Sequence, residues 1–143
     1  MAFPFKRILV PVDFDQSSLK ALEIAAKIAQ QNDGTAFVLH IVPVDIDVTG
    51  MPQYVDLIKR QESLDREKLT AIAKHHVAEV KWEILDEMGQ PAEVIAEVAA
   101  KLPADLIVMV THGRRGLARL IEGSIADKVL RSAPCPVLAV RQE

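Results

Sequence analysis

Short runs of β-branched and aliphatic residues alternate along this chain with longer segments whose apolar residues recur every three or four positions. The predicted strands are Arg7–Val12, Thr35–Val42, Val80–Leu85, Ala104–Val110 and Pro136–Arg141. The predicted helices run over 17–33, from residue 53 to about residue 78, from Pro91 to Leu102 and over 123–133. This alternation favours an α/β fold with an open, doubly wound parallel sheet, because parallel strands need helical crossovers between them.

Residues with special backbone preferences fall near the predicted ends of these elements. Pro11 removes one ladder donor near the end of the first strand, and Pro91 suits the first position of a helix. Gly34 suits the residue that follows a helix, and 43–52 is typical of a surface loop. The run KRQESLDREK in the second helix is typical of a solvated face rather than of a partner site.

Composition limits the class of protein. The 143 residues are 50% hydrophobic and 26% charged, which predicts a single domain over residues 1–143 with a sizeable core. The lone Cys135 excludes a disulfide scaffold and indicates a reducing, cytoplasmic setting. The longest aliphatic run, Leu106–Val110, is too short for a membrane span, and Lys6, Arg7 and Asp13 interrupt any apolar core of a secretory signal. A net charge of −3 and 4% aromatic residues argue against nucleic-acid binding.

Ligands of doubly wound sheets bind outside the carboxyl ends of the strands, where the strand order reverses. The candidate positions are therefore Asp13–Phe14, Pro43–Val44, Asp86–Met88 and Thr111–Gly113. The segment THGRRGLARLIEGSIADKV adds arginines and a Gly123–Ser124 helix start, which together are typical of a phosphate site. The alternative is that the glycines form turns and Ser124 caps a helix.

Other polar residues also leave two interpretations open. Asp13 either accepts a hydrogen bond from a ribose hydroxyl or caps loop amides, and His112 either donates to a phosphate or fills a turn. His40 lies within an apolar strand and is interpreted as a core histidine, and Cys135 as structural. The chain lacks the G-x-G-x-x-G, Walker, H-E-x-x-H, C-x-x-C and G-x-S-x-G signatures. The sequence therefore does not predict an efficient enzyme.

Three blocks of sequence make the chain similar to the universal stress proteins over essentially its whole length. They are KRILVPVDFDQSSLKALEIA, GQPAEVIAEVA and ADLIVMVTHGRRGLARLIEGSIADKVLRSAPCPVLAV. The resemblance implies a five-stranded parallel α/β fold of the adenine-nucleotide hydrolase type, Rossmann-like, with strand order 3-2-1-4-5 and helices on both faces. It also implies a homodimer through the fifth strand, Val137–Val140, whose apolar edge invites pairing.

The family's nucleotide motif is a glycine, two residues, a second glycine, nine residues, and a glycine followed by Ser or Thr. Gly113 and Gly123–Ser124 match the later positions, whereas Val110 stands where the first glycine is expected. Val110 either crowds the ribose or points into the sheet, and we expect the second. The resemblance assigns ribose and adenine contacts to Pro11, Val12 and Asp13, adenine-edge contacts to backbone near Ile41 and Val42, and phosphate contacts to His112, Gly113, Arg114, Gly123, Ser124 and Ile125.

The resulting hypothesis is a cytoplasmic stress-response protein that binds ATP or AMP, with or without magnesium, and acts as a ligand-sensing or regulatory module. At most weak ATP hydrolysis is expected, and neither nucleic acid nor membrane is an expected partner. Two alternatives remain open: a dimeric interaction protein of the branch that lacks nucleotide binding, with a vestigial pocket, and a slow ATPase.

Overall fold

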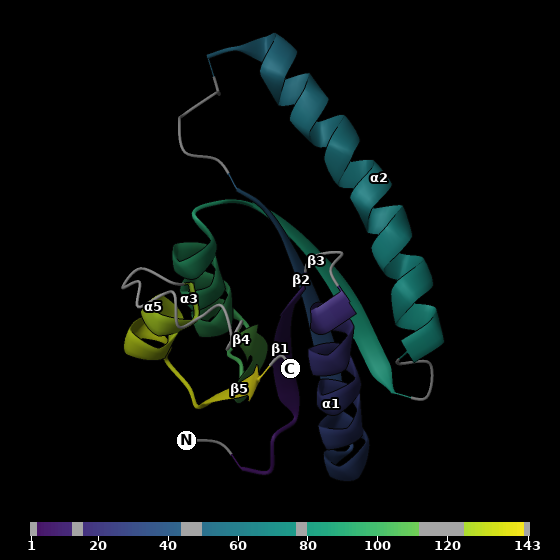
Figure 1. Cartoon of the computed structure of the whole chain (residues 1–143), viewed down its shortest axis with the longest axis vertical. Coiled ribbons are helices and arrows are strands. Elements are labelled where there is room, and N and C mark those ends of the chain that lie inside the picture. Colours follow the sequence, from purple (N-terminus) through teal and green to yellow (C-terminus); the bar gives the residue numbers. More distant parts are fainter. Residues whose placement is uncertain (1–2, 13–15, 44–49, 77–79, 112–124, 142–143) are drawn as a thin grey trace.

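The computed structural model describes residues 3–12, 16–43, 50–76, 80–111 and 125–141 (Figure 1). Its strands are β1 (Arg7–Val12), β2 (Thr35–Pro43), β3 (Lys81–Gly89), β4 (Leu106–Thr111) and β5 (Val137–Arg141). Its helices are α1 (Gln16–Asn32), α2 (Pro52–His76), α3 (Pro91–Lys101) and α5 (Ile125–Ser132). Each strand therefore alternates with a helix in the described chain, as the sequence pattern predicts.

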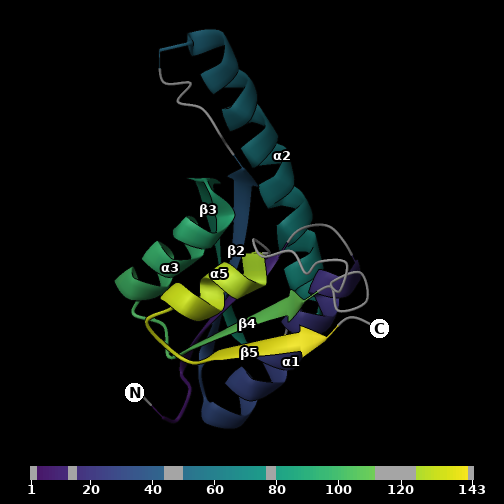
Figure 2. The same ribbon diagram turned by 60° about the vertical axis from the view of Figure 1, so that its left-hand side comes forward.

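The five strands form one sheet in the order β3-β2-β1-β4-β5, and every neighbouring pair is parallel. Helices α1 and α2 cover one face, and α3 and α5 cover the other (Figure 2). The predicted doubly wound sheet with strand order 3-2-1-4-5 is confirmed. Because the order reverses beside β1, the switch point lies between β1 and β4.

Successive residues of a strand point to opposite faces of the sheet, so the strands contribute side chains to two apolar cores, one on each face. On β1, Ile8 and Val10 point to the core beneath α1, and Leu9 points to the core beneath α3 and α5. All three are fully buried. Burial of each such aliphatic side chain contributes about 1.5–3 kcal/mol. Strands that are apolar on both faces are therefore held in the middle of the fold.

Asp105 fixes β1 against β4 at the amino ends of these strands. Its Oδ2 accepts hydrogen bonds from the backbone N–H groups of Lys6 and Arg7, both at 2.9 Å. Its own N–H donates to the Arg7 carbonyl at 2.8 Å, and the Arg7 guanidinium donates to the Leu102 carbonyl at 2.7 Å. The two strands are thus joined at the end of the sheet opposite the carboxyl ends of the strands.

The turn after α1 differs from the prediction in its mechanism. The residue with left-handed backbone is Asp33, with φ of 56°, rather than Gly34. The Gly34 N–H closes the helix by donating to the Ala29 carbonyl at 2.8 Å. A Cβ at Gly34 would lie 2.6 Å from the Lys6 carbonyl oxygen, so glycine is required there by close approach to the chain leading into β1.

The bounds of β3 and β4 differ most from the prediction, and those of β2 and β5 differ by one residue. β3 continues to Gly89, paired with β2 up to Pro43, so Asp86–Met88 lies within the strand rather than after it. β4 begins at Leu106 and ends at Thr111, so it lies slightly further toward the carboxyl end of the chain than predicted. The cause for β3 is its long partner: β2 supplies ladder partners over its whole nine-residue length.

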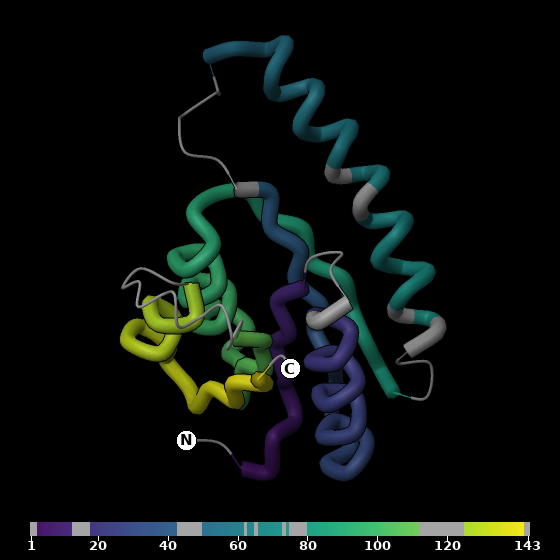
Figure 3. The backbone as a smooth tube through the Cα atoms, viewed as in Figure 1, coloured from purple at the N-terminus to yellow at the C-terminus, as the bar shows by residue number. Residues whose placement is uncertain are grey.

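Helix α2 packs on the sheet through its carboxyl-terminal part alone. Leu69 is buried and Ile72 packs against the core beneath α1 and α2. The amino-terminal part extends beyond the ends of β2 and β3 (Figures 1 and 3). Helical periodicity predicts that Val55 and Ile58 face inward, but they are only half-buried for this reason.

Candidate functional site: the switch point between β1 and β4

The ladder between β1 and β4 is short. It consists of the register pairs Ile8–Leu106 and Leu9–Ile107. On its other side, β1 is paired with β2 over its full length, ending at Val12–His40. The last three residues of β1 therefore lie next to β4 without a ladder to it. This early end of pairing falls at the switch point, where doubly wound sheets bind ligands.

Pro11 gives a physical reason for the early end. The Arg7 carbonyl accepts the Asp105 N–H, so the backbone groups of alternate residues Arg7, Leu9 and Pro11 face β4. The next bond of the ladder would need an N–H at residue 11, and proline has none. The β1–β2 ladder continues because its donors on β1 are the residues between these. A single proline therefore frees one side of the strand and leaves the other side paired.

The described site residues lie at the carboxyl ends of adjacent strands. Pro11 and Val12 end β1, and Ile41 and Val42 are the two residues before Pro43, which ends β2. Val12 is buried in the core beneath α1, whereas Ile41 packs on the opposite core, beneath α3. Their side chains thus anchor the strand ends on both faces, which fixes the backbone there.

Val110 packs against the core beneath α1 and is half-buried. Its register partner on β5 is Val140, which is buried in the same core. The isopropyl group therefore points into the fold, in agreement with our expectation that Val110 does so rather than crowding a ribose.

The phosphate side of the predicted site falls largely outside the described residues. The predicted phosphate residues His112, Gly113, Arg114, Gly123 and Ser124 lie outside the described residues, and so does Asp13, which is predicted to contact the ribose. Ile125 is the first residue of α5 and is exposed. The structure thus brings together the end of β1, the end of β2 and the end of β4, and the phosphate contacts stay a prediction from the sequence.

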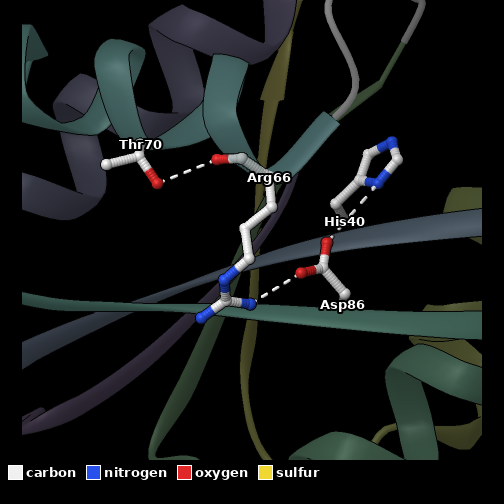
Figure 4. A network of polar contacts seen from close by, with 4 residues as sticks. All are labelled: His40, Arg66, Thr70 and Asp86. Atoms are coloured by element: carbon white, nitrogen blue, oxygen red, sulfur yellow. Dashed lines mark hydrogen bonds and ion pairs between the residues drawn. The ribbon is translucent and has the colours of Figure 1, made fainter. Parts of the chain in front are cut away.

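The sequence does not predict a polar network that lies beside the site and joins two largely buried side chains to one half-exposed arginine. His40 on β2 and Asp86 on β3 are register partners, with 3.9 Å between Nδ1 and Oδ1, and Arg66 of α2 donates to Asp86 Oδ2 at 2.6 Å (Figure 4). Thr70 donates to the Arg66 carbonyl one turn further along α2. The available signal was one polar residue near the end of each of two adjacent strands, but recognising it needs the β2–β3 register.

Cys135 is half-buried just before β5 and packs against the core beneath α5. Burial raises the pKa of its thiol, and the negative charge of Asp105 raises it further. A neutral thiol is a poor nucleophile, so the structural interpretation of Cys135 is supported.

Among the described residues, no cluster of three or more His, Cys, Asp or Glu side chains could hold a metal ion. None of the helices described is both long enough and apolar enough to cross a membrane.

Comparison with known proteins decides the family. The model of the universal stress protein family matches residues 4–141. The chain belongs to the universal stress protein family. The universal stress protein MJ0531 of Methanocaldococcus jannaschii is 35% identical to it over 144 residues, which cover 96% of this chain and 83% of that protein. A universal stress protein from the QAH/OAS sulfhydrylase 3′ region of Thermus aquaticus is 36% identical over 138 residues, covering 96% and 99%.

Solved structures share the fold of this universal stress protein. UspA from Lactobacillus plantarum superposes with a TM-score of 0.80 at 25% identity, covering 96% of this chain and 98% of that one. A universal stress protein in complex with cAMP gives 0.72 at 24% identity, covering 97% and 98%. The universal stress protein of Archaeoglobus fulgidus in complex with dAMP gives 0.69 at 22% identity, covering 95% and 98%. These likenesses establish the fold, and the bound nucleotides are properties of those two proteins.

Proposed function

We propose that this universal stress protein binds an adenine nucleotide, ATP or AMP, at the switch point, and that the bound nucleotide regulates its action as a cytoplasmic stress-response module. The observation that carries the proposal is the early end of the β1–β4 ladder, whose last register pair is Leu9–Ile107. It leaves backbone of both strands available at the edge where related folds hold nucleotides. The cAMP and dAMP complexes of two proteins with this fold support the same class of ligand.

In this proposal the ribose and adenine lie against the ends of β1 and β2. Pro11, Val12 and Asp13 contact the ribose and the adenine ring, and backbone groups near Ile41 and Val42 read the adenine edge. The anchoring of Val12 and Ile41 in opposite cores supports this arrangement, because it fixes the backbone on which such contacts depend. Val110 lies beside the site without entering it.

The phosphates are assigned to the segment that leads into α5. Its members are His112, Gly113, Arg114, Gly123, Ser124 and Ile125. N–H groups at a helix start and nearby guanidinium groups suit an anion. Magnesium, where it accompanies ATP, is carried mainly by phosphate oxygens with few protein ligands.

Calorimetric titration with ATP and with AMP tests the nucleotide site. Gly123→Val should weaken binding about tenfold or more, because a side chain would occupy the phosphate position. Gly50→Val is the matched control, since a Cβ at Gly50 meets nothing within 4 Å. Ser124→Ala should cost less, about 0.5–1.5 kcal/mol, because the helix amides remain.

The result that overturns the nucleotide proposal is an absence of binding by the wild-type protein to both nucleotides, together with no nucleotide carried through purification as judged by native mass spectrometry. That result would favour the alternative, an interaction protein with a vestigial pocket. Equal nucleotide affinities of the wild type and Gly123→Val would show that the phosphates do not bind to this segment.

We propose further that two copies associate through β5, the strand at one edge of the sheet. The Ile107 N–H donates to the Pro136 carbonyl, so residues 136, 138 and 140 face β4 and residues 137, 139 and 141 face the open edge. Val140 is only 8% exposed, so its side chain belongs to the core and not to a seam. Backbone pairing along the edge is thus the contact to test.

Ala139→Pro removes an N–H that faces the open edge and leaves the β4 ladder in place. Ala139→Ser is the matched control because it keeps that N–H. Sedimentation velocity should show a lower mass for Ala139→Pro alone. An unchanged mass in a folded Ala139→Pro protein would show that the copies do not meet through β5.

A further inference from the structure

The amino-terminal half of α2 extends beyond the sheet (Figures 1 and 3) and carries exposed apolar side chains. Every described side chain from residue 52 to residue 64 is exposed except Val55 and Ile58, which are half-buried. Tyr54, Leu57 and Leu64 are 50%, 56% and 49% exposed. A free helical segment of this length is marginally stable in water, so a covering surface would stabilise it.

The exposed apolar residues belong to one stripe along the helix. Positions three and four apart lie on one side of a helix, and the stripe follows that spacing over more than four turns. Its members, all exposed, are Tyr54, Leu57, Gln61, Leu64, Lys68 and Ala71. We call these six residues the α2 stripe. The α2 stripe lies beside the side of the helix that carries the buried Leu69, and not on that side. Pairing through the stripe therefore does not compete with the packing of α2 on the sheet.

We propose that the α2 stripe pairs with the same stripe of a second copy of this chain, with the two helices antiparallel. Charge selects this occupant and this direction. Arg60 and Glu67 flank the stripe on one side, seven residues apart, and both are exposed. In an antiparallel pair centred between Gln61 and Leu64, Arg60 of each helix lies opposite Glu67 of the other. Two identical ion pairs then form across the twofold axis.

The same register gives matching layers along the stripe. Tyr54 lies opposite Ala71, so a large ring meets a small side chain. Leu57 lies opposite the aliphatic stem of Lys68, and Gln61 lies opposite Leu64. With two polar residues among the six, the pairing is reversible and depends on protein concentration.

This surface is separate from the β5 edge. Helix α2 packs on β2 and β3, at one end of the strand order, whereas β5 is the other end. Two different isologous contacts on one chain build either closed tetramers or open chains of dimers. The α2 contact therefore adds a second level of assembly to the proposed β5 homodimer.

Sedimentation velocity of the full chain over a range of concentrations tests the α2 contact, in the wild-type and Ala139→Pro backgrounds. Arg60→Glu should weaken self-association about tenfold or more, because it replaces two attractions with two repulsions. Adding Glu67→Arg should restore it, because the reversed charges face each other again. Lys59→Glu is the matched control: it makes the same change in net charge on the side of the helix away from the stripe. Far-ultraviolet circular dichroism confirms that each variant is folded.

In the Ala139→Pro background the expected result is a monomer–dimer equilibrium that responds to these substitutions. Ala139→Pro lowers the sedimenting mass through loss of the β5 contact, and Arg60→Glu lowers it separately through loss of the α2 contact. Failure of the β5 proposal and failure of the α2 proposal are therefore distinguishable. The α2 proposal is overturned by a monomer at all concentrations in that background, by an equal effect of Lys59→Glu, or by a double variant that stays as weak as Arg60→Glu. The series in the wild-type background decides the question if Ala139→Pro does not fold.

Discussion

Arg66 Nη1 on α2 donates a 2.6 Å hydrogen bond to Oδ2 of Asp86 on β3 (Figure 4). The contact is made where α2 leaves the sheet: Leu69, three residues later, is buried, and Leu64, two residues earlier, is exposed. The Asp86 side chain is only 14% exposed, and its other oxygen faces His40. Arg66 therefore compensates a largely buried carboxylate and fixes the point from which the free half of α2 extends.

Arg66→Met should destabilise the protein by about 1–2 kcal/mol, measured by urea unfolding. The methionine keeps an aliphatic stem but leaves the Asp86 carboxylate without its charged donor. The cost is limited because the Arg66 side chain is 52% exposed and water replaces part of the interaction. Lys59→Met is the control, a loss of charge on an exposed side of the same helix.

A double-mutant cycle identifies the cause of the destabilisation. Asp86→Leu removes the carboxylate that needs the donor, so Arg66→Met should cost little in that background. If Arg66→Met is equally costly with and without Asp86, the loss comes from helix packing and the contact in Figure 4 is not responsible.

Most of the fold could be predicted from the sequence because strand and helix periodicities differ and alternate cleanly. The strand β1, the start of α3 at Pro91 and the order of the strands agree with the prediction. The end of β3 could not be predicted, since Asp86 and Glu87 are poor strand formers and are held there by pairing with β2. The positive φ at Asp33 could not be predicted either, because glycine is the usual residue with positive φ and Gly34 is its neighbour.

The site could be predicted only in part. Its place follows from the reversal of strand order, and Pro11 was noticed as a missing donor, but the side of the strand that it frees requires the ladder. The network of His40, Asp86 and Arg66 joins three elements far apart in sequence, and no local pattern reports such a contact. The charged run of α2 predicts a solvated face, and its described side chains are exposed, but composition does not show that half of the helix leaves the sheet.

Pro11→Ala should extend the β1–β4 ladder by one bond. The new N–H at position 11 faces β4, and hydrogen exchange should show it protected. The free energy of unfolding should change little, because a net gain of about 0.5–1.5 kcal/mol from the bond opposes about 0.4–1 kcal/mol of added chain entropy in the unfolded state. ATP affinity should fall as the strands close.

Pro134→Ala is the control for Pro11→Ala, since Pro134 is exposed before β5 and far from the switch point. A new amide that exchanges as fast as an unfolded one would show that Pro11 does not end the ladder. If the new amide is protected but the ATP affinity is unchanged, the nucleotide does not bind between the ends of β1 and β4.

Val110→Gly should destabilise the protein by about 1–3 kcal/mol with little change in ATP or AMP affinity. The lost isopropyl group packs on the core beneath α1, and glycine adds backbone entropy within a strand. Val110→Ala separates the two causes, because it removes packing and keeps the Cβ. An affinity gain above about tenfold, ~1.4 kcal/mol, would contradict the observed packing and restore the crowding interpretation.

Cys135 should react slowly with iodoacetamide while the protein is folded. The thiolate is the nucleophile, and burial first, then the charge of Asp105, raises the pKa of this thiol above its ordinary value of 9.0. The pH at which the rate reaches half its maximum should therefore lie above the value found for the same thiol in denaturant. A half-maximal pH equal in the two states would show that neither burial nor Asp105 acts on the thiol.

The same shift predicts a loss of stability in alkaline solution. Because the native pKa exceeds the unfolded one, the native state holds the thiol proton more tightly. The resulting stabilisation is complete below the unfolded pKa and is lost as the pH rises through the native pKa. Urea unfolding at a series of alkaline pH values should show this decline in the wild type and a weaker one in Cys135→Ala, in which nothing titrates at that position. Parallel declines in the two proteins would assign the alkaline instability to other groups.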